Sequence, residues 1–332
     1  MRYLITFFIG VLASAGIVAL LVMVQEGVPT SSSKWASDLY QLKDAHARAS
    51  GEPKLLIVSG SNSVFGINAN TIKDTYSLPT TNYGVHAGLG LRYLLERSKR
   101  VLNEGDIVYL PLEYALYQQT PKPSSQLMDF LLATDPEYFQ SLPPYEKLHG
   151  YLNISFSRIW EGIKGGSNRY QGSSAKIYHV MNIDKSGNQR AESIEQAGIH
   201  TDKLANLPPK DIGNGELTAY SREILTGYFE WAQSKNICVI GAPPNLLYHE
   251  AYKSDNFQQF FRGIVSFFNS NDIPFAGSAK DYLLPVDLFF DTEYHLNANG
   301  IESRTQLTVR DLGPDPKRLC KDKIASLNSN PI

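Results

Sequence analysis

This 332-residue chain has few cysteines and no marked excess of positive or negative charge. Its two cysteines, Cys238 and Cys320, with no Cys/His spacing typical of structural zinc, predict neither a disulfide framework nor a zinc site. Cys238 lies in the apolar run 237–240 and is interpreted as a small buried hydrophobic residue. Lys and Arg number 31 against 33 Asp and Glu, which leaves no electrostatic case for binding nucleic acid.

Two common enzyme signatures are also missing. The chain has no G-x-S-x-G motif, which speaks against an ordinary α/β-hydrolase, and the glycines at 81–90 fit no nucleotide-binding fingerprint. No internal repeat is apparent. The composition, 42% hydrophobic and rich in Tyr and Phe, is that of a folded protein with one large domain or two modest ones.

One long apolar run stands at the N-terminus. Tyr3–Val24 contains no charged residue, and at about 1.5 Å per residue it is long enough to cross a hydrocarbon core of about 30 Å. We expect an uncleaved transmembrane anchor over residues 1–26, with a cleaved signal peptide as the alternative because Ala13-Ser14-Ala15 is similar to a cleavage site. Arg2, ahead of the run, favours a cytoplasmic amino terminus and an exported body.

The rest of the chain has an alternating pattern. Residues 27–53 are interpreted as a linker and a lead-in helix, and 54–332 as one domain with an insertion at 120–215 that forms part of the substrate cleft. In that domain, short apolar strands alternate with helical segments, which predicts a parallel sheet in a three-layer α/β/α sandwich. The predicted strands lie at 55–58, 106–112 and 236–242.

Ser61 follows the first of these strands, at the edge of the sheet where open α/β folds place their chemistry. Gly60 lets the backbone turn sharply, and Asn62 offers a side-chain amide beside the serine. Ser61 is therefore a candidate nucleophile. The alternative is an ordinary polar turn after a strand.

Two further segments point to the same edge. The loop with Gly84 and Gly88 enters a helix, so its backbone N–H groups meet the physical requirement of an oxyanion hole. Glu113 follows the second strand and is a candidate carboxylate of the substrate cleft, with a solvated or helix-capping role as the alternative.

His295 and Asp291 lie close together before the last helix. An imidazole with an ordinary pKa of about 6.5 can take the proton of a serine and return it to a leaving group, and a carboxylate can orient it. A lone histidine is more often structural. The upstream serine and the nearby acid favour the catalytic interpretation.

Together these pieces resemble the SGNH/GDSL hydrolase superfamily. The matching blocks are Gly60-Ser61-Asn62, the loop with Asn82, Gly84 and Gly88, and Asp291 with His295. The resemblance covers roughly residues 54–312 and implies a flavodoxin-like SGNH fold. With the apolar N-terminus, the chain is more narrowly similar to the anchored proteins of bacterial envelope and exopolysaccharide acylation, such as the D-alanyl transfer protein of teichoic acid synthesis and the alginate acetylation proteins.

The resemblance assigns roles to the matching residues. It implies Ser61 as nucleophile, His295 as base and Asp291 as orienting acid, with the Ser61 and Gly88 amides in the oxyanion hole. Three residues separate the acid from the histidine, where family members typically have two, and Thr292 occupies the usual acid position.

The family's Gly-x-Asn-Asp block has no counterpart here. The corresponding strand ends in 111–114, so the side-chain oxyanion donor is left to two candidates, Asn62 and Asn245. Asn245, which follows the third strand, is also expected in the substrate cleft with Glu113. Loss of one such donor lowers the rate by about 10²–10³.

The sequence thus predicts a serine-dependent O-acetyl esterase or acyltransferase that acts on an envelope or extracellular polysaccharide. The resemblance implies a periplasmic domain on a bacterial inner membrane and a membrane-bound O-acyltransferase or polysaccharide synthesis complex as partner; no cofactor or metal ion is expected. Two alternatives stay open: a non-catalytic component that binds polysaccharide or an assembly partner, and a lipid-directed esterase or thioesterase, for which long acyl chains would be the preferred substrates.

Overall fold

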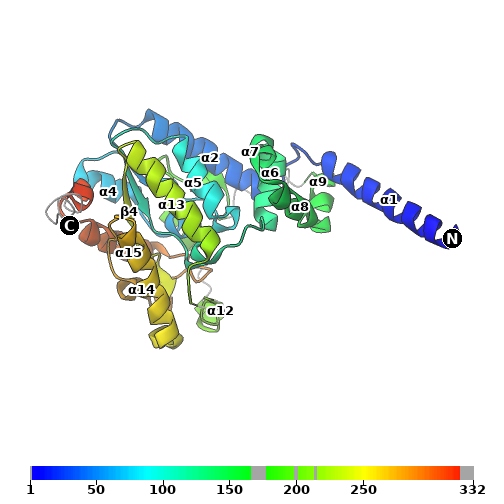
Figure 1. The fold of residues 1–332 in the computed structure, drawn as a ribbon. Helices are drawn as coiled ribbons and strands as arrows, with labels where there is room; N and C mark the ends of the chain where they lie inside the picture. The colour runs from blue at the N-terminus through cyan, green and yellow to red at the C-terminus, as the bar shows by residue number, and fades with distance from the viewer. Residues whose placement is uncertain (1, 166–176, 198–200, 213–214, 322–332) are drawn as a thin grey trace. The chain divides into compact units, whose positions relative to one another are not determined.

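The computed structural model describes residues 2–165, 177–197, 201–212 and 215–321 (Figure 1). The strands are β1 (Leu55–Ile57), β2 (Thr80–Asn82), β3 (Ile107–Leu110), β4 (Cys238–Gly241), β5 (Leu246–Leu247) and β6 (Leu283–Leu284). The α-helices are α1 (Arg2–Met23), α2 (Ser31–Ala49), α3 (Ser61–Val64), α4 (Ala69–Tyr76), α5 (Leu91–Lys99), α6 (Ser125–Thr134), α7 (Pro136–Ser141), α8 (Pro144–Leu152), α9 (Phe156–Ile163), α11 (Ala191–Ala197), α12 (Thr201–Ala205), α13 (Ala219–Ser234), α14 (Asp255–Ser270) and α15 (Ala298–Leu312). Short 3₁₀ helices are η1 (Ala87–Leu89), η2 (Tyr114–Gln118), η3 (Val180–Asn182), η4 (Glu250–Lys253), η5 (Ala279–Tyr282) and η6 (Val286–Leu288).

The chain divides into two compact units. The first comprises Met1–Ser37 and Pro121–Ala175, and the second comprises Asp38–Thr120 and Lys176–Ile332. The segment 120–215, expected as one insertion, therefore contributes to both units. Its residues 166–176, 198–200 and 213–214 lie outside the described part of the chain.

The prediction of a transmembrane helix over residues 1–26 is wrong. This segment forms α1, and among the residues that the structure describes no helix has the length and apolar character needed to cross a membrane. The predicted fold of an α/β sandwich with an N-terminal transmembrane helix is corrected accordingly. What the structure contains is an α/β fold with a small parallel sheet.

Arg158 in α9 holds the first unit together. Its guanidinium donates to Gln25 Oε1 at 2.6 Å, to the Val28 carbonyl at 2.7 Å and to Asp129 Oδ1 at 3.2 Å. The other oxygen of Asp129 accepts a hydrogen bond from the Thr30 hydroxyl at 2.5 Å. Segments more than a hundred residues apart in sequence are thereby joined within this unit.

The second unit is built on a four-stranded parallel sheet in the order β2-β1-β3-β4. Ile57, at the end of β1, lies in register with Asn82 at the end of β2 and with Tyr109, one residue before the end of β3. Because the strands are parallel, the loops after all of them leave from one edge. The candidate residues Ser61, Gly88, Glu113 and Asn245 all follow strand ends at this edge.

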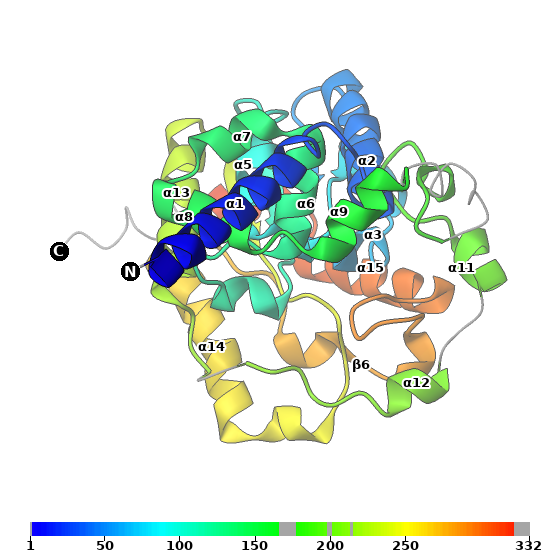
Figure 2. The same cartoon turned by 90° about the vertical axis from the view of Figure 1, so that its right-hand side faces the viewer.

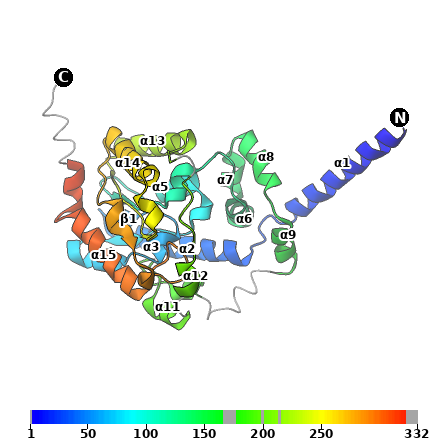
Figure 3. The same cartoon turned by 90° about the horizontal axis from the view of Figure 1, so that it is seen from below.

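Helices cover the sheet of the second unit. Alternate strand residues such as Leu55, Tyr109 and Ile240 form an apolar cluster with Ile72 of α4 and Leu312 of α15. Helices α5 and α13 pack side by side (Figure 1), and α13 and α15 lie on opposite sides of the sheet (Figure 3). The short helix α11 packs against α15 (Figure 2). Buried strands without polar alternation are the pattern that such two-sided cover requires.

Cys238 and Cys320 form a disulfide, contrary to the expectation from their number. Their Cα atoms are 6.0 Å apart, and 82 residues separate them in sequence. The bond ties the segment after α15 to the start of β4. With only two cysteines, the sequence gives no spacing pattern from which this pairing can be inferred.

Lys43 of α2 is fully buried in the second unit, and its ammonium donates to the Gly84 carbonyl. Burial lowers the pKa of Lys43 to about 7, while the nearby Asp184 carboxylate acts in the opposite direction. The unfolded side chain has a pKa of about 10.4. Between these values the unfolded state binds more protons than the folded state, so folding becomes more favourable as the pH rises.

We therefore expect the free energy of unfolding to rise between pH 7 and about pH 10, by up to about 1.4 kcal/mol per pH unit. Urea denaturation at several pH values measures this slope. Lys43→Met should flatten it, whereas Lys280→Met, which removes an exposed ammonium, should leave it unchanged. Equal slopes in the two variants would contradict the assignment to Lys43.

Candidate active site

Ser61 is the first residue of α3, directly after the turn that follows β1. The turn is tight: a Cβ atom on Gly60 would lie 2.4 Å from Glu113 Oε1 and 2.5 Å from the Ala87 nitrogen. Only glycine fits between these groups. The close approach brings the turn before Ser61 against the loop at Ala87.

Glu113 is not an open cleft residue, which corrects its predicted role. Its carboxylate accepts hydrogen bonds from the Gly60 N–H at 2.9 Å and the Asn62 N–H at 3.0 Å, and its side chain is buried. These two amides flank Ser61 on either side. The carboxylate therefore fixes the backbone of the nucleophile turn.

The three predicted triad residues meet. Ser61 Oγ lies 2.9 Å from His295 Nε2, and His295 Nδ1 lies 2.8 Å from Asp291 Oδ1. When the imidazole donates its Nδ1 proton to the carboxylate, Nε2 is left to accept the serine proton. The serine is half-buried and the histidine nearly fully buried, so the pair is shielded and still reachable.

A turn at Thr292 brings the acid and the histidine together despite their unusual spacing in sequence. The Thr292 hydroxyl oxygen accepts hydrogen bonds from the Tyr294 and His295 N–H groups, at 3.3 and 3.1 Å. Thr292 is thus used to shape the loop. The turn brings Asp291, four residues before His295, against the ring.

Two aromatic residues hold the imidazole in place. The Phe65 ring stacks on the His295 ring with 4.3 Å between centroids and 19° between planes. Tyr178 packs on Phe65 at 5.5 Å, and its hydroxyl donates to Asp291 Oδ2 at 2.6 Å. The backbone also connects the two halves of the site, because the Leu296 N–H donates to the Phe65 carbonyl at 2.9 Å.

Asn62 and Asn245 belong to the interior scaffold, contrary to their predicted place as oxyanion donors. Both are fully buried, and their amide groups donate to the Pro111 and Tyr294 carbonyls at 3.0 and 2.8 Å. The guanidinium of Arg304 links them: it donates to Asn62 Oδ1 and the Asn62 carbonyl, each at 2.7 Å, and to Asn245 Oδ1.

The Gly88 N–H, predicted as an oxyanion donor, already has a partner in the protein. The Gly88 N–H donates to His86 Nδ1 at 2.9 Å, so it is engaged within its own loop. Burial lowers the pKa of His86; the Glu113 carboxylate opposes this effect and the nearby His295 adds to it. A neutral His86 ring with Nδ1 as acceptor therefore lies near the triad.

Two backbone amides remain as candidate oxyanion donors. Within the described residues, neither the Ser61 N–H nor the Ala87 N–H donates a hydrogen bond, because each begins a helix. Since Ala87 N lies 2.5 Å from the Cβ position of Gly60, the two nitrogens are at most about 6 Å apart. Paired N–H groups at this separation can face one oxygen.

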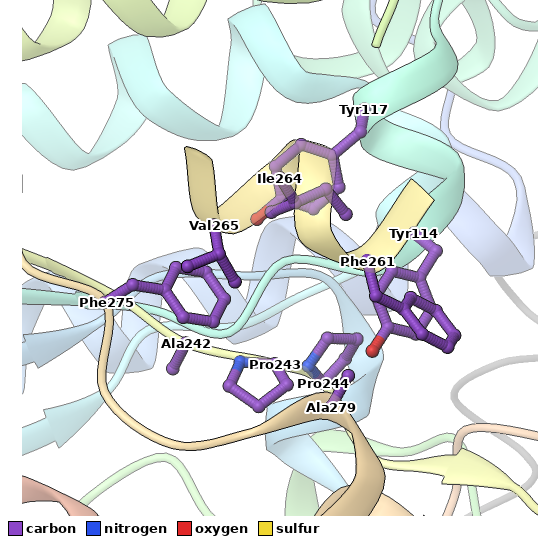
Figure 4. Close-up of a pocket in the computed structure, with 10 residues that line it drawn as sticks. All are labelled: Tyr114, Tyr117, Ala242, Pro243, Pro244, Phe261, Ile264, Val265, Phe275 and Ala279. Carbon is purple, nitrogen blue, oxygen red and sulfur yellow. The ribbon is translucent and has the colours of Figure 1, made fainter. Parts of the chain in front are cut away.

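A small apolar cavity lies beside these loops, where β3 and β4 end. It is lined by Tyr114 and Tyr117 of η2, by Pro243 and Pro244, and by side chains of α14 (Figure 4). Its volume of about 10 Å³ has room for about one water molecule. A space this small belongs to the core and does not hold a substrate.

No known family model matches this chain, and no curated protein is significantly similar to it in sequence. The site must therefore be judged on its own geometry. Among the described residues, no group of three or more His, Cys, Asp or Glu side chains is placed to hold a metal ion.

Sequence reasoning missed Tyr178, His86 and Arg304. His86 carried a local signal, because it stands inside the glycine loop that was singled out. Tyr178 and Arg304 carried none: they reach the site across 113 and 242 residues of sequence.

Proposed function

We propose that this protein is a serine-dependent O-acyl esterase or acyltransferase. The single observation that carries the proposal is the continuous contact from Ser61 Oγ to His295 Nε2 and from His295 Nδ1 to Asp291. Carbohydrate O-acetyl esters are the proposed substrates, on the strength of the resemblance to the SGNH/GDSL superfamily in the three blocks around Ser61, Gly88 and His295.

The reaction has two steps. Ser61 Oγ attacks the ester carbonyl carbon while its proton passes to His295 Nε2, and the oxyanion is stabilised by the Ser61 and Ala87 N–H groups. The bond to the leaving alkoxide then breaks, and the imidazolium returns the proton to it. Water or a sugar hydroxyl attacks the acyl-enzyme in the same way, which regenerates the serine.

The disulfide supports an extracytoplasmic location. Disulfides persist in oxidising compartments and are rare in the cytosol. The Cys238–Cys320 bond therefore favours the periplasm or the cell exterior, where envelope and extracellular polysaccharides are found. Supply of the acyl group by a membrane-bound O-acyltransferase stays a prediction.

Mass spectrometry of an acyl-enzyme tests the proposed function. The purified chain is mixed with p-nitrophenyl acetate, quenched in acid within seconds and digested. We expect one acetyl group on the peptide that contains Ser61, because the nucleophile accumulates the acyl group before slower deacylation. Acetylation spread over surface lysines, with Ser61 unmodified, would contradict the proposal.

One observation favours a non-catalytic role instead. The amide groups of Asn62 and Asn245 are both used inside the scaffold, so neither supplies the side-chain oxyanion donor of the family. A polysaccharide-binding component that retains the fold accounts for this. Equal ester hydrolysis by the wild type and Ser61→Ala, combined with glycan binding, would support this second candidate.

A further inference from the structure

Tyr178 reaches the triad from a segment that matches none of the three catalytic blocks. Its hydroxyl donates to Asp291 Oδ2 at 2.6 Å and lies 3.3 Å from His295 Nδ1. The carboxylate is thus held at both oxygens, by the imidazole at Oδ1 and by the phenol at Oδ2. A carboxylate bound at both ends has less freedom to rotate away from the ring.

The place of Tyr178 is itself fixed. Its ring packs on Phe65 at 5.5 Å, and Phe65 stacks on the His295 ring at 4.3 Å. The three rings therefore form one packed group, and the phenol oxygen is aimed at the carboxylate by this packing. Tyr178 is 36% exposed, and the partial loss of solvent around its hydroxyl, with the adjacent Asp291 charge, raises the pKa of Tyr178, so the hydroxyl keeps its proton and remains a donor.

We propose that Tyr178 is a positioning residue of the acid–base pair, acting through Asp291 to hold the carboxylate in line with His295 Nδ1. This inference rests on the proposed function. It addresses the one irregular feature of the triad, the extra residue between acid and histidine. Thr292 shapes the turn, and Tyr178 sets the orientation of the carboxylate that the turn carries.

The obvious alternative is that Tyr178 only covers the site or binds substrate. A cover residue would act through its ring, which Tyr178→Phe retains. A substrate-binding hydroxyl would change KM. A positioning hydroxyl instead lowers kcat, leaves KM unchanged and alters the environment of the proton between His295 and Asp291.

The test compares Tyr178→Phe with wild type, using p-nitrophenyl acetate kinetics and the low-field proton NMR resonance of His295 Nδ1–H. We expect kcat to fall about tenfold with KM unchanged, the effect of one lost hydrogen bond to a charged group, and the resonance to shift or broaden. Tyr248→Phe is the matched control, because its hydroxyl bonds a surface carboxylate, Glu250, and should change neither readout.

Any other result overturns the proposal. A kcat within twofold of wild type, a change confined to KM, or a lower kcat with the resonance unmoved each removes the role assigned to Tyr178. Ser61→Ala separates this failure from failure of the proposed function: if it hydrolyses the ester as fast as wild type, the enzyme proposal falls. The His295 Nδ1–H resonance still tests the contact if the enzyme proposal falls. If Tyr178→Phe leaves that resonance unshifted, the hydroxyl of Tyr178 does not contact Asp291.

Discussion

Ser61→Ala should lower kcat/KM for an acetyl ester by about 10⁴-fold or more. The alcohol is the only group in the triad that forms the covalent bond, and in serine hydrolases its removal leaves only the contribution of the oxyanion hole and binding. In the proposed mechanism that remainder comes from the Ser61 and Ala87 N–H groups, which the substitution keeps. KM should change little, because the lost interaction is made in the transition state.

The measurement is ester hydrolysis by the wild type, Ser61→Ala, His295→Ala and the double variant. Because serine and histidine act as a unit, the double variant should be no slower than either single variant. A fluorophosphonate probe should label the wild type and fail to label Ser61→Ala. Ser234→Ala is the control, since Ser234 is exposed on α13 and its hydroxyl donates within its own helix, to the Trp231 carbonyl.

Additive effects of the two substitutions would indicate that the serine and histidine work independently. Loss of activity in Ser234→Ala would point to a general effect on folding. Unchanged hydrolysis in Ser61→Ala would remove the enzyme proposal, whatever the geometry of the triad.

The residues of the site that could be predicted from the sequence are those that lie in recognisable local patterns. A β-branched run ending in Gly60 and Ser61 marks the end of a buried parallel strand, and parallel strands share one edge, so the serine and the glycine loop were expected together. His295 was expected there because an acid and a helix start stand beside it. These inferences needed only neighbours in sequence.

The parts that escaped prediction depend on tertiary contacts. Glu113 was expected to face a cleft, yet its carboxylate is buried and accepts hydrogen bonds from the Gly60 and Asn62 N–H groups. Asn62 and Asn245 were expected as donors to substrate. Instead their side chains form hydrogen bonds with Arg304 and with two backbone carbonyls. A side chain's polarity indicates that it needs partners, and only the folded chain decides whether these are protein or substrate.

The N-terminal anchor shows a different kind of error. The apolar run at Tyr3–Val24 was assessed by length and charge, and the structure contains no helix, among the described residues, that meets the requirement for crossing a membrane. The disulfide was not predicted for a third reason. Two isolated cysteines 82 residues apart in sequence carry no information about whether they pair.

Arg304→Met should lower the free energy of unfolding by about 3–5 kcal/mol, because buried oxygen atoms lose a charged hydrogen-bond donor. Arg304 is fully buried in α15, and its guanidinium donates to both oxygens of Asn62 and to Asn245. Methionine keeps the apolar stem and removes the donors. Three buried oxygen atoms would then lack their partner, each at a loss of about 1–3 kcal/mol before relaxation.

Arg310→Met is the matched control on the same helix. Arg310 contacts two carboxylates, of Asp281 and Asp311, both at 2.7 Å, and its side chain is 51% exposed. Surface ion pairs of this kind contribute about 0–1 kcal/mol. Urea denaturation of the two variants therefore separates buried hydrogen bonds to neutral oxygens from exposed ion pairs, and equal losses would contradict the scaffold role of Arg304.

The buried arginine also links stability to chemistry. Burial lowers the pKa of Arg304 to about 10, and the Glu113 carboxylate is among the groups that oppose this, so the guanidinium stays charged near neutral pH. It holds the Asn62 carbonyl from one side while Glu113 holds the Asn62 N–H from the other. Under conditions where Arg304→Met is still folded, we expect slower fluorophosphonate labelling of Ser61, because the turn that presents the serine has lost one of its two supports.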